Sequence, residues 1–148
     1  MAVRVAQHTL VKIVSKIDPN MVFDAKGMND GEPIVLYQDR GETNQKWLLV
    51  DAGNGEKMIA CINSGKVLDV KDASPNNDTP IQQYFDLHGN NQLFRLVELR
   101  DGFFKIVSKL DPKKVLDAKG GGHPANDTPI VLYQDNGGDN QQWRLDPI

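Results

Sequence analysis

The sequence has a single cysteine, Cys61, so no internal disulfide can form and the fold must rest on packing alone. No apolar run approaches the roughly 20 residues of a membrane-spanning helix, and the N-terminal stretch MAVRVAQHTLVKIVSK alternates where a signal peptide would have an apolar block. Basic residues are scattered and the net charge is −3, which argues against a nucleic-acid partner. These absences predict synthesis in a reducing cytoplasm, with non-classical release left open, and no membrane insertion.

Motifs for catalysis or metal binding are also scarce. Cys61 lies in an apolar stretch without an identifiable base, as expected of a buried, inert thiol. The acidic stretches at 72–78 and 126–127 lack the ordered oxygen-ligand spacing of a calcium loop. The three histidines are His8, His88 and His123, and no two of them occupy corresponding positions. His88 and His123 fall in loops rich in Gly, Asn and Pro. We therefore expect no enzyme activity, no cofactor and no metal.

What the 148 residues do contain is one unit repeated three times, over approximately residues 8–51, 56–99 and 102–148. KIVSKIDP at 12–19 returns as KIVSKLDP at 105–112. FDAKG at 23–27 corresponds to LDVKD at 68–72 and to LDAKG at 116–120. PIVLYQD occurs at 33–39 and again at 129–135, with PIQQYFD at 80–86 between them, and each copy closes on NQKWLL, NQLFRL or NQQWRL.

The hydrophobic period within each copy is two, which predicts strands and no helix. Four apolar segments per copy are separated by turn residues such as Asp18-Pro19, Ser64-Gly65 and Asp111-Pro112. Hairpin signals at residues 53–55 and at Asp101-Gly102 join the copies. Twelve short strands follow, and since four strands cannot bury their apolar face alone, the three copies must share one core.

These three ordered Gln-x-aromatic copies, each with a Leu-Asp-type strand and a Pro-Ile-x-x-aromatic strand, resemble the ricin-B-type β-trefoil lectins. The resemblance runs from about His8 to Leu145. It implies a single all-β domain over residues 1–148, a β-trefoil of twelve short strands. Because it lacks paired cysteines, the chain resembles the small leaderless trefoil lectins more than the secreted plant lectins.

The Gln-x-aromatic motif is interpreted as structural. We expect its three rings, Trp47, Phe94 and Trp143, to converge in the shared core, where each can bury about 150–250 Å². The glutamines, Gln45, Gln92 and Gln141, are expected to hold the neighbouring loop through hydrogen bonds to its backbone.

The resemblance implies a sugar site in each copy, made of an aspartate after the second strand, an aromatic on the third and the asparagine before the Gln-x-aromatic motif. The carboxylate would accept hydrogen bonds from sugar hydroxyls, the amide would donate and accept, and the ring would pack on the C–H face of a pyranose. A further aspartate two residues after each tyrosine would add an acceptor or orient the site. The predicted residues are Asp24, Tyr37, Asp39, Asn44 and Gln45 in copy one, and Asp117, Tyr133, Asp135, Asn140 and Gln141 in copy three.

Copy two is predicted to bind more weakly, through Asp69, Tyr84, Asp86 and Asn91. The position three residues after the tyrosine, often polar and in contact with the sugar in this family, is Arg40 in copy one and Asn136 in copy three, but Leu87 in copy two. A leucine side chain cannot hydrogen-bond to a sugar hydroxyl.

The expected ligands are galactose- or N-acetylgalactosamine-containing glycans on glycoproteins or glycolipids, with a homodimer left open. The alternative is a β-trefoil protease inhibitor, which needs one exposed loop and no repeated Asp/Tyr/Asn set, because fold alone does not decide function. A trefoil that has lost binding is a third reading. A glycosidase would need a second carboxylate opposite each aspartate, and the sequence shows no such pair.

Overall fold

The computed structural model describes residues 8–148, so the alternating N-terminal segment at residues 1–7 lies outside it. It contains twelve strands and five single-turn 3₁₀ helices, in agreement with the predicted all-β class. The strands are β1 (His8–Ser15), β2 (Met21–Ala25), β3 (Ile34–Gln38), β4 (Trp47–Gly53), β5 (Glu56–Cys61), β6 (Val67–Val70), β7 (Thr79–Tyr84), β8 (Phe94–Glu98), β9 (Phe103–Ser108), β10 (Lys114–Ala118), β11 (Thr128–Gln134) and β12 (Trp143–Pro147). The 3₁₀ helices are η1 (Thr43–Gln45), η2 (Lys71–Ala73), η3 (Asn90–Gln92), η4 (Arg100–Gly102) and η5 (Asp139–Gln141).

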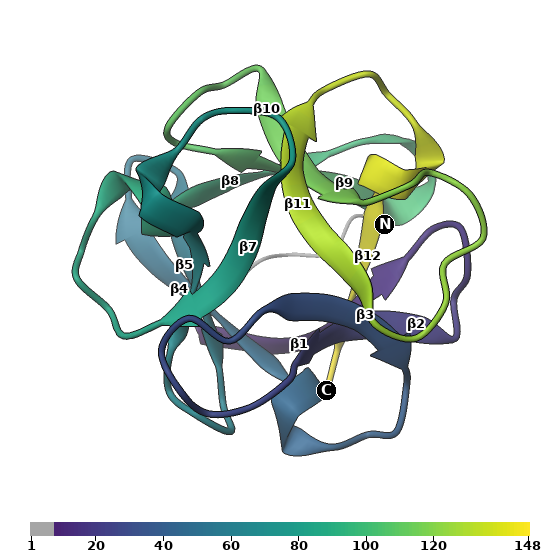
Figure 1. Cartoon of the computed structure of the whole chain (residues 1–148), viewed down its shortest axis with the longest axis horizontal. Coiled ribbons are helices and arrows are strands. Elements are labelled where there is room, and N and C mark those ends of the chain that lie inside the picture. Colours follow the sequence, from purple (N-terminus) through teal and green to yellow (C-terminus); the bar gives the residue numbers. More distant parts are fainter. Residues whose placement is uncertain (1–7) are drawn as a thin grey trace.

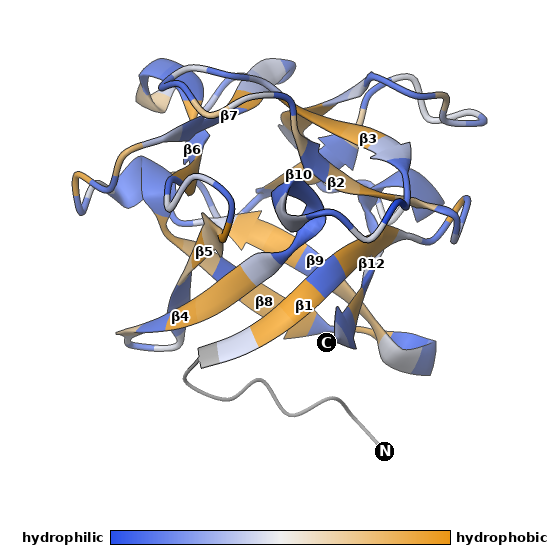
Figure 2. Ribbon diagram, turned by 90° about the horizontal axis from the view of Figure 1, so that it is seen from below, coloured by the Kyte–Doolittle hydropathy of each residue, from blue (hydrophilic) through white to orange (hydrophobic). Residues whose placement is uncertain are grey.

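Six strands close an antiparallel barrel. Strand β1 pairs with β4 and β12, β5 with β4 and β8, and β9 with β8 and β12. The other six form the hairpins β2–β3, β6–β7 and β10–β11. Figure 1 looks down the pseudo-threefold axis, around which β3, β7 and β11 form a triangle, and Figure 2 shows this cap above the barrel. Barrel and cap together are the predicted β-trefoil, which is thereby confirmed.

The shared core contains the three rings of the Gln-x-aromatic motif. Trp47, Phe94 and Trp143 are all fully buried in one apolar cluster, as the sequence predicts. Phe23 connects the two tryptophans edge-on, with ring centroids 6.5 Å from Trp47 and 4.8 Å from Trp143. Each indole N–H donates to a backbone carbonyl, of Phe23 for Trp47 and of Leu116 for Trp143, so neither buried donor is left unpaired.

A two-residue latch in each copy ties it to the third strand of the next copy around the axis. The first latch residue accepts a backbone N–H at its side-chain oxygen, and the second donates its own N–H to a backbone carbonyl. The second position has a positive φ in every copy, which favours Gly, Asp or Asn there. In copy one the latch is Asp30-Gly31, which accepts from the N–H of Phe85 and donates to the carbonyl of Gln83. In copy two it is Asn77-Asp78, which accepts from Gln134 and donates to Leu132. In copy three it is Asn126-Asp127, which accepts from Gln38 and donates to Leu36.

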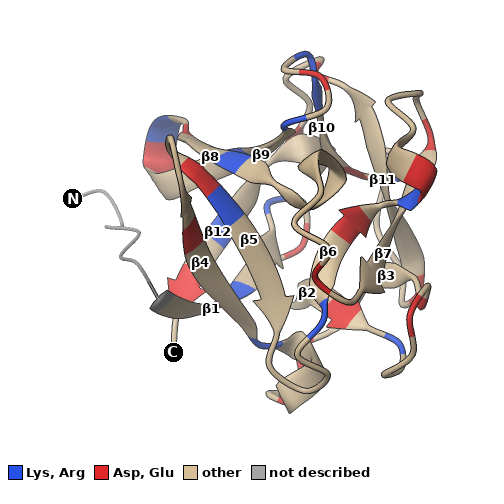
Figure 3. Ribbon diagram, turned by 90° about the vertical axis from the view of Figure 1, so that its left-hand side faces the viewer, with Lys and Arg blue, Asp and Glu red and all other residues tan. Residues whose placement is uncertain are grey.

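Charged residues of both signs are interspersed over barrel and cap, and no stripe of Lys and Arg follows any strand in Figure 3. Among the helices described in residues 8–148, none has the length and apolar character to cross a bilayer. Cys61 is a fully buried free thiol at the end of β5.

Candidate functional site

The predicted sugar-site aspartates lie near the ends of β2, β6 and β10, just before the loops that lead to β3, β7 and β11. Asp24, Asp69 and Asp117 are only 6%, 3% and 4% exposed. Each faces a residue on the other strand of its hairpin, Val35, Gln82 and Val131 respectively. A nearly buried carboxylate must be held by hydrogen bonds, because an unpaired buried charge is costly.

In copy one, Gln45 supplies that support. Its Nε2 donates to Asp24 Oδ2 at 3.0 Å and to the carbonyl of Gln38 at 2.9 Å, while its Oε1 accepts the N–H of Arg40 at 2.8 Å. The backbone contacts confirm the expectation that this glutamine holds the loop. Gln45 was predicted as a site residue, but its contact with the aspartate was not, and this contact shows how the glutamine supports the carboxylate. Gln92 and Gln141 make the same three kinds of contact in copies two and three.

Burial changes the acidity of these carboxyls. It raises the pKa of Asp24, Asp69 and Asp117 above the 3.8 of a free aspartate, and hydrogen bonds from the glutamines offset part of that rise. In Asp24 and Asp117 the oxygen that the glutamine does not contact is therefore a desolvated acceptor, positioned before a ligand arrives.

The asparagine and tyrosine of copy one lie in the same cleft as Asp24. Asn44 donates from Nδ2 to the carbonyl of Ala25 at 3.2 Å, which fixes its amide beside the end of β2. Tyr37 is half-buried. An open cleft of about 180 Å³ is lined by Asp24, Lys26, Tyr37, Arg40, Glu42 and Asn44. The structure thus brings together Asp24, Tyr37 and Asn44, with Gln45 behind them. Asn91 and Asn140 make the matching bonds, to Val70 and Ala118.

The aspartates two residues after the tyrosines are held elsewhere. Asp39 pairs with Lys12 at 2.8 Å and accepts the N–H of Gly41, and Asp135 pairs in the same way with Lys105 at 2.9 Å. The hydrogen bond from the lysine lowers the pKa of each of these two carboxyls. Asp86 instead accepts the N–H of His88. Of the two roles predicted for these residues, the contacts are those of an orienting one, since Asp39 does not line the copy-one cleft.

Cations lie over the aromatic ring in copy one. The Arg40 guanidinium is 4.8 Å and the Lys26 ammonium 5.3 Å from the Tyr37 ring centroid, and Arg40 also donates to the tyrosine hydroxyl. Lys26 in addition contacts Asp127 of the copy-three latch. Sequence reasoning missed Lys26 and Glu42. Only the difference between copies could have indicated Glu42, because Gly89 and Gly138 stand at its position in copies two and three.

Copy two differs at the carboxylate itself. Gln82 donates to Asp69 Oδ1 at 3.1 Å while Gln92 donates to Oδ2 at 2.9 Å, so protein amides engage both oxygens. In copies one and three the facing residue is a valine, which makes no such bond. Nearby, Phe85 stacks on Tyr84 with 5.5 Å between ring centroids, and Leu87 is 56% exposed. The sequence showed the Val-to-Gln difference but not its consequence for the aspartate.

Within residues 8–148 no group of three or more His, Cys, Asp or Glu side chains is placed to hold a metal ion. The repeated arrangement is a shallow set of fixed hydrogen-bonding groups beside a half-buried ring. Such a surface suits reversible recognition of a polar ligand with one apolar face.

Several solved structures share this architecture. ThreeFoil, a designed three-fold symmetric protein, superposes with a TM-score of 0.90 at 35% identity, covering 94% of this chain and 99% of that chain. An exo-β-1,3-galactanase from Clostridium thermocellum gives 0.87 at 34% identity, covering 95% of this chain but 30% of the enzyme. The Macrolepiota procera ricin B-like lectin, in complex with lactose, gives 0.85 at 22% identity over 97% and 99% of the two chains, a likeness of fold alone.

No curated protein matches the sequence. The family model described as ricin-type beta-trefoil lectin domain-like matches residues 4–84, 43–133 and 90–148, overlapping segments that together span nearly the whole chain. Membership of this family supports carbohydrate binding. The repeat, the closed barrel with its threefold cap and this match lead to one conclusion: the chain belongs to the ricin-type β-trefoil lectin-like family.

Proposed function

We propose that this protein is a lectin that binds galactose- or N-acetylgalactosamine-containing glycans without transforming them, chiefly through the sites of copies one and three. The observation that carries the proposal is the recurrence of one arrangement: a buried aspartate supported by glutamine, beside a tyrosine and an asparagine anchored to the backbone. A core could be packed without keeping these polar groups in both copies.

The chemistry of the site supports a sugar ligand, and the relatives support the galactose class. The aspartate oxygen left free in copies one and three can accept from a sugar hydroxyl, and a pyranose can lay its C–H face on the tyrosine. The Macrolepiota procera lectin is in complex with lactose, a galactose-containing disaccharide. The Clostridium thermocellum neighbour, whose matched region is 30% of its length, is an exo-β-1,3-galactanase.

The three sites should differ in strength. Over residues 8–148 no cation lies above the Tyr133 ring, whereas Arg40 and Lys26 lie over Tyr37 and must be accommodated or displaced by a stacked sugar. Copy two has a carboxylate already engaged by Gln82. We therefore infer the affinity order copy three, copy one, copy two.

Each site offers a few hydrogen bonds and one ring, so single-site affinity should be weak, on the order of millimolar to high micromolar. Two such sites on one rigid domain raise avidity on a glycan-dense surface without further contacts.

No catalysis is proposed, because the repeated arrangement contains one carboxylate per site. Glu42 adds a second in copy one only, and a glycine replaces it in the other copies. Incubation with a chromogenic galactoside should therefore release no product, and turnover that disappears in Glu42→Gln would contradict this assignment.

The decisive experiment is a glycan array followed by titration with lactose and N-acetylgalactosamine. Site occupancy can be followed in the side-chain amide signals of Asn44, Asn91 and Asn140. The double variant Asp24→Ala, Asp117→Ala should lose binding by about tenfold or more, since hydrogen bonds to charged groups contribute about 1.5–3 kcal/mol. Asp51→Ala, in the β4–β5 hairpin, is the matched control.

Two outcomes would separate the parts of this proposal. If the array and both titrations show no binding, the lectin assignment fails, and inhibition of proteases becomes the next function to test. If lactose binds equally to the wild type and to the double aspartate variant, the protein is a lectin but the site lies elsewhere.

A further inference from the structure

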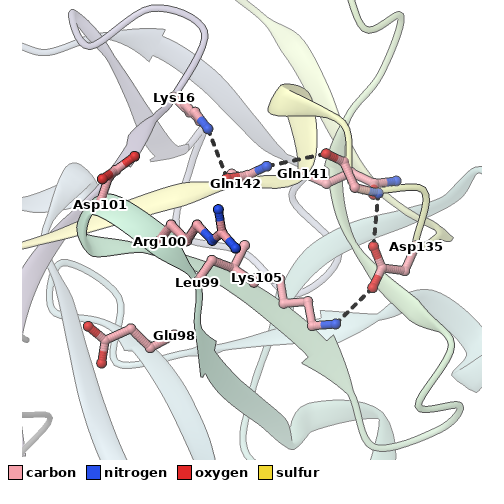
Figure 4. Close-up of a pocket in the computed structure, with 10 residues that line it drawn as sticks. Lys16, Glu98, Leu99, Arg100, Asp101, Lys105, Asp135, Gln141 and Gln142 are labelled. Atoms are coloured by element: carbon pink, nitrogen blue, oxygen red, sulfur yellow. Dashed lines mark hydrogen bonds and ion pairs between the residues drawn. The ribbon is translucent and has the colours of Figure 1, made fainter.

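A cleft of about 600 Å³ lies beside the predicted copy-three sugar site, with which it shares Asp135 and Gln141 but not Asp117, Tyr133 or Asn140. It lies between the β8–β9 hairpin, the end of β1 and the start of β12, and Figure 4 shows the side chains that line it. Its walls include Lys16, Arg100 and Gln142, with the Lys105–Asp135 ion pair on one side. The loop from Asp135 to Gln141 separates it from the copy-three sugar site, so the two sites share that loop.

Some of the charged side chains that line this cleft have a partner of opposite charge, and others have none within residues 8–148. Lys105 and Asp135 neutralise each other at 2.9 Å. Lys16 donates to Gln142 Oε1 at 3.1 Å, lies 3.4 Å from Asp139 and sits over the Phe103 ring at 5.0 Å. Three further charged side chains line the cleft without a hydrogen bond or ion pair in the described structure: Glu98, Arg100 and Asp101.

Arg100 is the free cation among them. In Figure 4 its side chain extends from the hairpin into the cleft, towards Gln142. Gln142 uses Nε2 to donate to the carbonyl of Gly137 at 3.2 Å, which fixes its amide and leaves one N–H for a ligand. A planar guanidinium with no carboxylate partner is suited to a bidentate contact with an incoming one.

The fold does not require this set of polar groups. At the corresponding place in copy two, Leu93 stands for Gln142 and Met58 for Lys105, and the short β4–β5 hairpin at residues 51–55 offers no arginine. The fold therefore does not require Gln142 or Arg100 at this place, although copy one keeps a matching ion pair, Lys12–Asp39.

We propose that this cleft binds a carboxylate-bearing saccharide unit, of the uronic or sialic acid class. Arg100 pairs with the carboxylate, Lys16 adds a second positive charge, and the amide of Gln142 donates to a hydroxyl. Asp101 and Glu98 on the hairpin accept from the remaining hydroxyls, a role that a simple anion would not use. The choice of a saccharide rests on the proposed lectin function and on the loop shared with the copy-three site.

The test is a titration with the methyl glycosides of glucuronic acid and N-acetylneuraminic acid, with neutral methyl glucoside as comparison. The side-chain amide signal of Gln142 should shift saturably with an acidic sugar and not with the neutral one. Arg100→Gln should weaken this binding about tenfold or more, and Gln142→Leu, which introduces the copy-two residue, should also weaken it. Arg95→Gln, the same change on neighbouring β8, should leave it unaltered.

The proposal would be overturned by no shift at Gln142 with either acidic sugar or by unchanged binding in Arg100→Gln. Equal binding of inorganic sulfate would also overturn it and would make the cleft a general anion site. Stronger binding of a tetraglutamate peptide than of the sugars would overturn it in favour of an acidic peptide. The signals of Asn44 and Asn140 report separately on the lectin sites, so failure there leaves this result interpretable.

Discussion

The carboxylate of each site is both nearly buried and held by a glutamine, and this combination has consequences for binding at low pH. Because burial raises the pKa of Asp24 and Asp117 above 3.8, they begin to protonate at a higher pH than an exposed aspartate does. A protonated carboxyl is a weaker acceptor for a sugar hydroxyl. The dissociation constant for lactose should therefore rise as the pH falls from 7 through that raised pKa, which calorimetric titration can measure.

The same shift predicts an opposite trend in stability. A folded-state pKa above the unfolded value means that the ionised form costs stability at neutral pH, and that this cost is relieved as the pH falls through the folded pKa towards 3.8. Asp117→Asn removes this titration. Acidification should therefore stabilise the wild type relative to Asp117→Asn, so the variant's free energy of unfolding minus that of the wild type should decline. Urea denaturation at pH 7 and at lower pH measures this difference. A constant difference would mean that the carboxyl titrates normally.

Exchanging Gln82 of copy two and its counterpart Val131 of copy three tests whether the free aspartate oxygen sets the strength of a site. Replacing it with the valine of the other copies frees Asp69 Oδ1, and Gln82→Val should therefore strengthen lactose binding at copy two, seen as a shift of the Asn91 amide signal. The reverse change, Val131→Gln, should place an amide against Asp117 and weaken copy three severalfold. If both variants bind lactose as the wild type does, the free aspartate oxygen is not what distinguishes the sites.

The loops before β3, β7 and β11 act as connectors between copies. Asn126→Ala removes the acceptor for the Gln38 N–H and should lower the free energy of unfolding by about 0.5–1.5 kcal/mol. Asn77→Ala should cost more, because Asn77 also accepts from Lys114. Urea denaturation measures both. Asn29→Ala is the control, since its amide contacts only Glu32 of the same loop, and an equal loss there would contradict the latch.

The shared core makes the molecule one cooperative unit. Phe23 contacts the tryptophans of copies one and three, and the corresponding residues of the other copies are Leu68 and Leu116. Phe23→Leu should therefore cost only about 1–1.5 kcal/mol and Phe23→Ala about 3–5 kcal/mol. In both variants circular dichroism and tryptophan fluorescence should report one coincident urea transition. Separate transitions would mean that the copies unfold independently.

Much of this architecture is readable from the sequence because it is local. Alternating residues, turn residues and three ordered copies predict twelve strands, and a strand pattern that cannot bury its own face demands a common core. The buried positions of Trp47, Phe94 and Trp143 follow from the same reasoning, since large rings at corresponding positions must meet inside. Joint recurrence also picked out Asp24, Tyr37 and Asn44, which the structure places in one cleft.

The chain alone therefore determines the repeat, the strands and the set of recurring polar residues, because periodicity and turn chemistry act between neighbours in sequence. Which of those residues remain free for a ligand is a property of the folded molecule. Lys12 reaches Asp39, Gln82 reaches Asp69 and Arg40 lies over Tyr37 only after strands have paired and loops have packed. Side-chain contacts of this kind depend on register and on the copy opposite, and so three similar repeats become three different sites.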